Sequence, residues 1–484
     1  MPATIRVHSD QHLQPDPSRV IGRLFLPSTE PPHTRRARDL LERLSSLDEE
    51  TVKELLPGVL QGFGPHHPDL RGLLLANAAV LLDPKDEISE ARTLLIGAAF
   101  TAEYAVEGAA LTNPGVVPHP DQSGLADGQL RVAVTLRGIG EGHISALQFS
   151  AAVVDDRTWR FEERLAPPLV GSVTVAAVPR PLFDALVRAG REPDELTVAV
   201  LQGVPESVHR TDVEQILVDL PPDVLLHPEA HLRVQTLRRW AGSCYTVSFD
   251  EATTLDQRVL MPISEDERSG IEDARFTLYT DDDGTIQYRA CYTAFDGANI
   301  GNRLLTSADL LTFTSFPLTG PGARNKGMAL FPRKVGGNHV ALSRADGMTI
   351  GVTFSDDGYR WGESIPIETP HDAWQILHVG NASPPIETEA GWLVVTHGVG
   401  LMRTYSLGAI LLDLDDPTQV IGRLDRPLLP PVTHGGYVPN VVFSCGAICH
   451  RGRLFIPFGI GDASVSVASV ALDELLSDLQ SRPH

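Results

Sequence analysis

The feature that most constrains this fold is a long series of short β-prone segments separated by Gly, Asp and Pro. The series begins near Tyr104 and includes RVAVTLRG, RFTLYT, TIGVTFSDDG and WLVVTHGV. Many short strands joined by tight turns are typical of a sandwich, a barrel or a propeller. The sequence therefore predicts a mainly β domain over residues 104–484.

One hairpin is predicted with particular clarity. The stretch Gly270–Tyr292 reads GIEDARFTLYTDDDGTIQYRACY, with Asp283-Gly284 between two apolar, β-prone runs. Asp-Gly in such a position is a strong hairpin signal, because glycine adopts the positive φ that tight hairpin turns need. We therefore expect two antiparallel strands with Asp281–Gly284 as their turn.

Helical patterns occur at three places. Apolar residues recur at helical spacing over residues 34–100, which predicts a helical N-terminal extension over residues 1–103. Ser46 and Glu49 have the spacing of a capping box for a second helix there, and Pro57-Gly58 predicts its end. A helical insertion is expected at about residues 180–243, and a short helix in the C-terminal run ASVALDELLSDLQ.

Composition excludes several classes of protein. The formal net charge of −22 argues against a nucleic-acid partner, because phosphate backbones need a basic face. No run of 18 apolar residues predicts a transmembrane helix, and the N-terminus lacks the apolar core of a secretory signal. Four cysteines make no disulfide framework, and Cys445 and Cys449 lack the second pair of a zinc site. We expect a soluble, cytoplasmic protein without membrane partners or metal.

A cluster of charged residues stands at the entrance of the predicted hairpin. Glu272-Asp273-Ala274-Arg275 places two carboxylates beside a guanidinium, and such a group can carry proton chemistry on a polar substrate. The neighbouring carboxylate should raise the pKa of Asp273, whereas Arg275 should lower it, and the sequence leaves the balance open. A purely structural salt-bridged turn is the alternative interpretation.

Three other segments combine polar groups with strand ends. The first joins Asn113-Pro114-Gly115 to Leu136-Arg137-Gly138 and Gly142-His143. The second runs from Asn325-Lys326-Gly327 to Arg344. The third is GNASPPIETEAGWLVVTHG, which contains Glu387 and His397.

The order of these segments resembles glycoside hydrolase family 130, a family of five-bladed β-propellers that act on β-mannosides. The matching signatures are EDAR (where the family usually has Pro third), LFP, PPIETEAGW, THG, YSLGAILLDLDDP, NVVFSCG and FGIGD. The resemblance extends from about Asn113 to Leu479, interrupted by residues 180–243. It implies a five-bladed β-propeller with a helical N-terminal extension and a helical insertion.

The resemblance also implies roles for individual residues. Asp273 would be the catalytic general acid, its proton reaching the glycosidic oxygen through a sugar hydroxyl. Lys326, Arg344 and His397 would bind inorganic phosphate as co-substrate, with no metal or organic cofactor. Two departures weaken the phosphate site: Lys326-Gly327 replaces an Arg-Asn pair, and Glu387 stands where a lysine is expected.

A further set of residues is expected to surround the sugar. It comprises Asn113, Arg137, His143, Glu272, Arg275, Asp296, Tyr405, Phe443 and Asp462. Asp296 and Asp462 each follow a strand beside glycine, and an ordinary Asx turn is the competing explanation for both. Tyr292, Phe295, Trp374 and Tyr437 are other aromatic candidates, although aromatic side chains more often belong to the core.

The favoured function is an inverting phosphorylase that cleaves a β-manno-oligosaccharide or mannosyl-glycoside and releases mannose 1-phosphate. The first alternative is an inverting β-1,2-mannosidase in which a carboxylate such as Glu387 activates water. The second is a sugar-binding propeller without catalysis. A homo-oligomer formed through the helical extensions is compatible with either enzyme, because apolar helical faces must be buried somewhere.

Overall fold

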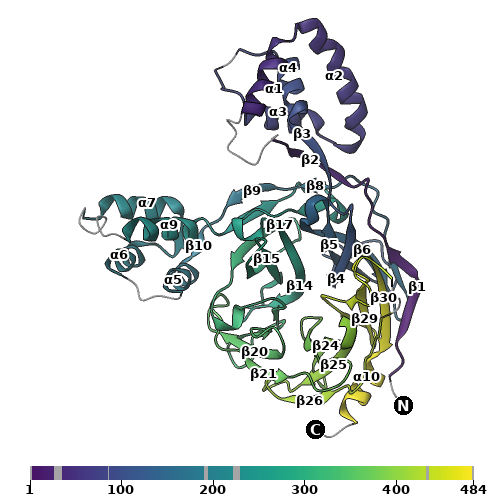
Figure 1. Ribbon diagram of the computed structural model, residues 1–484. Helices are drawn as coiled ribbons and strands as arrows, with labels where there is room; N and C mark the ends of the chain where they lie inside the picture. Colours follow the sequence, from purple (N-terminus) through teal and green to yellow (C-terminus); the bar gives the residue numbers. More distant parts are fainter. Residues whose placement is uncertain are drawn as a thin grey trace. The chain divides into compact units, whose positions relative to one another are not determined.

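The computed structural model describes residues 3–26, 35–85, 87–189, 194–221, 229–431 and 435–481. It divides into two compact units. The first comprises Met1–Pro15, Ala109–Arg164 and Val170–His484, and the second comprises Asp16–Gly108 and Leu165–Leu169. Strands outnumber helices in the first unit, which confirms the predicted mainly β class with some helices (Figure 1).

The largest sheet of the first unit is an extended series of neighbouring strands. It follows β4 (Ala110–Pro118), β5 (Leu130–Ile139), β6 (Ser145–Val154), β14 (Gly270–Thr280), β15 (Ile286–Phe295), β16 (Ile300–Ser307), β17 (Thr312–Pro317), β12 (Tyr245–Ser248) and β9 (Ser172–Val175). Two short strands also pair with β6: β7 (Trp159–Phe161) and β13 (Arg258–Leu260). β8 (Leu169–Val170) spans the sequence boundary between the units.

Smaller sheets complete the first unit. One contains β18 (Ala329–Leu330), β19 (His339–Ser343), β20 (Ile350–Ser355) and β21 (Ile365–Glu368). Another contains β22 (His378–Asn381), β23 (Ile386–Thr388), β24 (Gly391–Val399), β25 (Tyr405–Leu412) and β26 (Val420–Arg423). A third contains β1 (Arg6–Leu13), β27 (Val442–Phe443), β28 (Ile448–His450), β29 (Arg453–Ile460) and β30 (Ser464–Ala471). The shortest pairs β10 (Val178–Pro179) with β11 (Ser207–Val208).

The first strand of the chain belongs to the last sheet. β1 runs antiparallel to β30, with Arg6 opposite Ser469. This strand lies inside the segment for which we predict a helical extension, and the helices there begin only after it. The pairing was not visible in the sequence, because no local pattern names a partner strand so far away.

The predicted hairpin is confirmed. β14 and β15 pair with Thr280 opposite Ile286, and the Asp281 backbone N–H donates to the Thr285 carbonyl at 2.9 Å. Gly284 has a φ of 82°, which is the left-handed conformation that the turn requires.

Over the described part of Asp16–Gly108, the second unit contains two strands and four α-helices. They are β2 (Val20–Leu24), β3 (Thr101–Ala105), α1 (Arg35–Ser46), α2 (Glu49–Phe63), α3 (Leu70–Ala79) and α4 (Glu90–Ala99). Thr34, the first residue of the predicted helical segment, lies outside the described residues.

Two details of the predicted helix boundaries are wrong. Asp48 caps α2 by accepting the Thr51 backbone N–H, whereas Ser46 is the last residue of α1. Pro57 lies inside α2 rather than at its end. Proline is tolerated there because Pro57 and Gly58 are both exposed, so water can hydrate the carbonyl that loses its partner.

Helices of the first unit occupy the region of the expected insertion and the C-terminal run. They are α5 (Arg180–Arg188), α6 (Glu195–Gly203), α7 (Arg210–Asp219), α9 (Ala230–Ala241) and α10 (Leu472–Gln480). The first four share an apolar core against which Phe316 and Tyr359 pack. Among the described residues, no helix is long and apolar enough to cross a membrane.

A buried ion pair ties this helical region to the large sheet. Arg303 on β16 and Glu267 are 1% and 0% exposed, with 3.4 Å between Nε and Oε1. Arg303 also donates to the carbonyl of Ser243, just after α9, at 2.7 Å and to Ser315 Oγ at 2.9 Å. Tyr292 donates to Glu267 within the same network, so this aromatic residue belongs to the core.

We expect Arg303→Met to destabilise the protein strongly, because it leaves the Glu267 carboxylate buried without its cation. The loss should be about 3–5 kcal/mol of unfolding free energy. Thermal unfolding checks this, with Arg157→Met as the control, since Arg157 is 79% exposed. Equal melting temperatures for the two variants would contradict it.

Candidate active site

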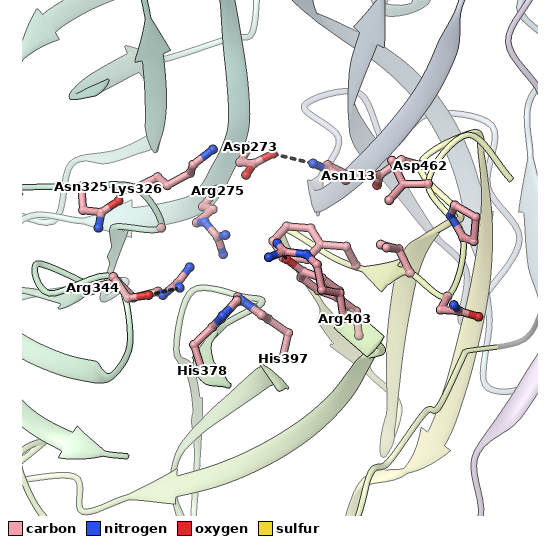
Figure 2. Close-up of a pocket in the computed structure, with 18 of the residues that line it drawn as sticks. Asn113, Asp273, Arg275, Asn325, Lys326, Arg344, His378, His397, Arg403 and Asp462 are labelled. Carbon is pink, nitrogen blue, oxygen red and sulfur yellow. Dashed lines mark hydrogen bonds between the residues drawn. The ribbon is translucent and has the colours of Figure 1, made fainter. Parts of the chain in front are cut away.

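A polar cavity of about 700 Å³ opens in the first unit. It receives residues from β4, β14, β22, β24 and β25 and from loops between strands. Its lining contains Asn113, Asp273, Arg275, Asn325, Lys326, Gly327, Arg344, Gly347, His378, His397, Met402, Arg403, Tyr405, Val438, Pro439, Asn440, Val441, Phe443 and Asp462. Figure 2 shows Asn113, Asp273 and Asp462 along one edge and Arg344, His378 and His397 along the opposite edge.

Asp273 is presented by an irregularity in β14. The register with β15 shifts between Glu272 and Arg275, and Asp273 has a φ of 54°. A left-handed backbone at a residue other than glycine costs free energy and is often found at functional sites. Asn113 Nδ2 donates to Asp273 Oδ1 at 2.5 Å, and Arg137 Nη1 lies 3.8 Å from the same oxygen. The carboxylate is therefore buried yet held from two sides.

Glu272 and Arg137 lie next to Asp273 but do not line the cavity. Arg137 Nη2 donates to Glu272 Oε1 at 2.6 Å, and Lys326 Nζ lies 3.3 Å from Glu272 Oε2. Both residues were predicted to bind sugar. The structure instead places them in an ion-pair network that fixes the strand carrying Asp273.

The pKa values of the two carboxyl groups of the cavity shift in opposite directions. Burial would raise the pKa of Asp273, but Arg137, Arg275, Lys326 and the bond from Asn113 together outweigh it and lower the pKa. Burial raises the pKa of Asp462, and the negative charges of Asp273 and Glu272 act in the same direction, against Arg137. The positive charges around Asp273 therefore have a larger effect on its pKa than burial does, and they favour the ionised carboxylate.

Two of the three guanidinium groups that line the cavity, those of Arg275 and Arg344, have buried Nε atoms and no carboxylate partner among the described residues. Within the described part of the chain, no carboxylate lies within ion-pair distance of Arg275 or Arg344. Arg275 donates only to the carbonyl of Asn381, and Arg344 only to that of Gly347, each at 2.8 Å. The Nε atoms of both are buried and unpartnered. Because a buried unpaired cation is costly, this arrangement suits an anionic ligand.

Two histidines lie beside these cations and are neutral. Burial, together with Arg344 and Arg403, lowers the pKa of His378 to about 4. Burial and the charges of Arg344 and Arg275 lower the pKa of His397 well below its usual value. His397 stacks on Tyr405 with 6.2 Å between ring centroids and contacts Phe443 at 4.8 Å. The histidines can therefore donate neutral hydrogen bonds to a ligand.

Glycine permits the close packing around His397. A Cβ atom on Gly380 would lie 2.5 Å from His397 Cε1 and 2.7 Å from Arg344 Cδ. Since Gly380 pairs with His397 across β22 and β24, any larger residue would separate the arginine from the histidine.

Three predicted site residues lie elsewhere. Glu387 binds Arg333 at 2.6 Å and does not line the cavity. It pairs with Trp392, five residues along β24 from His397, or about 17 Å at 3.3 Å per residue. Asp296 accepts the backbone N–H groups of Ala298 and Asn299 at 2.7 and 2.6 Å, so the Asx-turn explanation holds. His143 contacts Tyr437 Oη at 3.1 Å, and neither lines the cavity.

Sequence reasoning missed several lining residues. His378 offered no pattern of its own, although it begins the strand that leads into Asn381. Arg403 follows β24 in a loop where Met402 and Arg403 have φ values of 57° and 53°, which the sequence does not reveal. In the described residues, no group of three or more His, Cys, Asp or Glu side chains could hold a metal ion.

Comparison with known proteins identifies the family of the chain. A family model described as beta-1,4-mannooligosaccharide phosphorylase matches residues 247–481. A 1,2-beta-oligomannan phosphorylase from Thermoanaerobacter sp. (strain X514) is 35% identical over 247 residues, 48% of this chain and 79% of that protein. The chain belongs to glycoside hydrolase family 130. The predicted family resemblance is therefore confirmed.

Other members of family 130 are similar to parts of the chain. A beta-1,2-mannobiose phosphorylase from Listeria innocua is 32% identical over 239 residues, covering 47% of this chain and 65% of that protein. A solved structure of beta-1,2-mannobiose phosphorylase from Listeria innocua, in complex with beta-1,2-mannobiose, has a TM-score of 0.46 at 22% identity. That likeness covers 83% of this chain and 96% of the solved one. The names of these relatives agree with the predicted enzyme class.

The neutral state of His378 can be tested directly. We expect Arg403→Met to raise the pKa of His378 from about 4 towards the ordinary value, because one of the two neighbouring cations is removed. Imidazole resonances in a ¹⁵N-histidine NMR titration measure this shift. Arg157→Met should leave the titration unchanged, and an unaltered pKa in Arg403→Met would contradict the assigned cause.

Proposed function

We propose that this protein is a β-mannoside phosphorylase that releases mannose 1-phosphate. The observation that carries the proposal is a pair of guanidinium groups, Arg275 and Arg344, that have carbonyl but no carboxylate partners among the described residues, in a cavity that also holds Asp273. A dianion satisfies such groups because it offers several charged acceptors at once. The names of the relatives support phosphate as the co-substrate.

The residues divide into an acid and an anion site. Lys326, Arg344 and His397 bind phosphate, with Arg275 added to the set predicted from sequence. Phosphate oxygen attacks the anomeric carbon of the mannosyl group from the face opposite the glycosidic bond, which inverts the configuration. The electrons of the broken bond leave with the glycosidic oxygen, which receives the Asp273 proton through a sugar hydroxyl.

The charge balance explains how Asp273 obtains its proton. In the free protein the surrounding cations lower its pKa. A bound phosphate dianion counters the field of Arg275 and Lys326, so the pKa of Asp273 rises when phosphate is present. The acid thus becomes protonated when the nucleophile is in place.

The finer architecture that we propose is a five-bladed β-propeller. Its blades would be β4–β7, β14–β17, β18–β21, β22–β26 and β27–β30 with β1. Antiparallel pairing within each group and the pairing of β1 with β30 support this arrangement. A propeller places loops from every blade around one central pocket, as the cavity lining requires.

Hydrolysis with Glu387 as base has less support. Asp273 and Asp462 are the carboxylates among the described lining residues, and Glu387 is engaged by Arg333. An inverting hydrolase needs a base that holds water on the face opposite the acid. Glu387 is too far along its strand for that role.

The first test is incubation with β-1,2- and β-1,4-linked manno-oligosaccharides, with and without phosphate. We expect mannose 1-phosphate only when phosphate is present, and its α-anomer if inversion is correct. Chromatography and ³¹P NMR identify the product. Free mannose at a rate independent of phosphate would assign hydrolysis instead.

Variants of the acid and of the anion site should differ in kinetics. We expect Asp273→Asn to lower kcat by about 10²–10⁴-fold, as for loss of general acid catalysis. Arg344→Met should raise KM for phosphate about 10- to 100-fold, since hydrogen bonds to charged groups contribute about 1.5–3 kcal/mol. Initial rates measured against phosphate concentration distinguish the two effects. An unchanged phosphate KM in Arg344→Met would remove this residue from the site.

Replacement of Glu387 distinguishes a phosphorylase from a hydrolase that uses Glu387 as its base. We expect Glu387→Gln to keep kcat within about twofold, because its carboxylate pairs with Arg333 at the surface and surface pairs contribute little. A fall by orders of magnitude, with free mannose as product, would instead support Glu387 as the base of a hydrolase.

A further inference from the structure

Thr112 stands between the two carboxyl groups of the cavity. Its Oγ1 lies 3.0 Å from Asn113 Oδ1 and 3.3 Å from Asp462 Oδ1. The amide nitrogen of the same Asn113 donates to Asp273 at 2.5 Å. A continuous chain of hydrogen bonds therefore joins Asp462 to Asp273 through the side chains of Thr112 and Asn113.

The backbone around this chain is unusual. Asn113, Asp273 and Asp462 have φ values of 48°, 54° and 49°, so all three are left-handed. Such conformations persist only where the surroundings enforce them, and they gather at functional sites. Thr112 itself is 1% exposed, and a Cβ atom on Gly459 would come within 2.6 Å of its hydroxyl oxygen. The fold thus reserves space for this hydroxyl.

The number of protons decides which way the chain runs. The hydroxyl of Thr112 has one proton and can donate fully to one acceptor, while its oxygen can accept another hydrogen bond. Asn113 must turn its NH₂ group to the Asp273 carboxylate, so its carbonyl oxygen faces Thr112 and needs a donor. Thr112 also faces Asp462 Oδ1 as a donor, but at 3.3 Å rather than 3.0 Å, so the shorter contact with Asn113 takes the larger share of its single proton.

We propose that Thr112 is a positioning residue whose hydroxyl locks the Asn113 amide in the orientation that donates to Asp273, with Asp462 completing the chain. Without the hydroxyl, the amide oxygen of Asn113 is buried without a donor, and the amide is no longer fixed against rotation. The catalytic consequence rests on the proposed function, because it assumes that Asp273 is the acid. The orientation itself does not.

Other charged groups near this hydrogen-bond chain also act on Asp273 and Asp462. Those groups are unchanged in a Thr112 variant. Arg137, Arg275 and Lys326 face Asp273, and Arg137 and Glu272 face Asp462. The buried Cys445 thiol also lies within electrostatic range of both carboxyls. A change seen on substitution of Thr112 therefore reports the hydrogen-bond chain rather than a lost charge.

The test compares Thr112→Val, which removes the hydroxyl at nearly constant volume, with Thr112→Ser, which keeps it. We expect Thr112→Val to lower kcat by about 10- to 100-fold, as misplaced catalytic groups do, with KM for phosphate within about twofold. A weaker bond from Asn113 favours the neutral acid, so the alkaline limb of the kcat profile should move to higher pH. Thr112→Ser should restore both properties.

A control separates this effect from loss of a hydrogen-bonded threonine hydroxyl in general. Thr246 Oγ1 on β12 contacts Thr314 Oγ1 on β17 at 3.0 Å, both are partly buried, and neither lines the cavity. Thr246→Val should leave kcat and the pH profile unchanged. Wild-type kinetics in Thr112→Val, or a loss that Thr112→Ser does not restore, would overturn the positioning role.

A measurement without turnover keeps the inference separate from the proposed function. The carboxyl ¹³C resonance of Asp273, assigned by its absence in Asp273→Asn, gives the pKa of this group directly. We expect a higher pKa in Thr112→Val than in the wild type and in Thr112→Ser. Identical titrations would refute the inference even in an active enzyme, whereas inactivity towards all mannosides with the expected shift would refute only the proposed function.

Discussion

The cavity of this protein depends on one physical constraint. A cation that is buried without an anionic partner costs free energy. Arg275 is 1% exposed, and among the described residues its guanidinium donates to a backbone carbonyl, that of Asn381. Carbonyl dipoles compensate a guanidinium only in part, so the site is best satisfied when an anion arrives. The whole chain has a formal net charge of −22, so this concentration of positive groups is a local feature that the sheets must hold together.

Buried, paired strands hold the cationic groups of this cavity in place. His397 lies on β24, every residue of which is buried, and Gly380 opposite it leaves no side chain between the histidine and Arg344. Asp273 lies on β14 at the point where the pairing with β15 is irregular. Paired strand flanks the irregularity at Asp273 on both sides, whereas His397 lies at a position that pairs with Gly380 and Leu407.

Much of the fold could be predicted from local patterns. Asp283-Gly284 specified the hairpin, and the C-terminal apolar run specified α10, because both depend on neighbours in sequence. The pairing of β1 with β30 could not be predicted, since it depends on residues that local patterns do not connect. Pro57 within α2 likewise depends on exposure, which a sequence does not display.

For the cavity, the resemblance to family 130 assigned Asp273, Arg344 and His397 to one site, and all three line the cavity. Glu387 and Asp296 were misplaced for physical reasons. Side chains five residues apart on a strand are far apart in space, and a carboxylate beside glycine satisfies its own turn before it reaches a ligand. Thr112 carried no signal, because a threonine in a buried strand looks like an ordinary β-former.

The pairing of β1 with β30 has a consequence for biosynthesis. His8 and Ser469 touch across this pair at 2.9 Å although 461 residues separate them. At about 5–20 residues per second, the ribosome needs roughly 20 to 90 seconds to supply the second strand after the first. Asp462 lies in the turn just before β30, so the cavity acquires this wall last. A nascent chain therefore carries β1 as an unpaired edge for most of its synthesis, and chaperones that shield exposed strands would have their main task at its beginning.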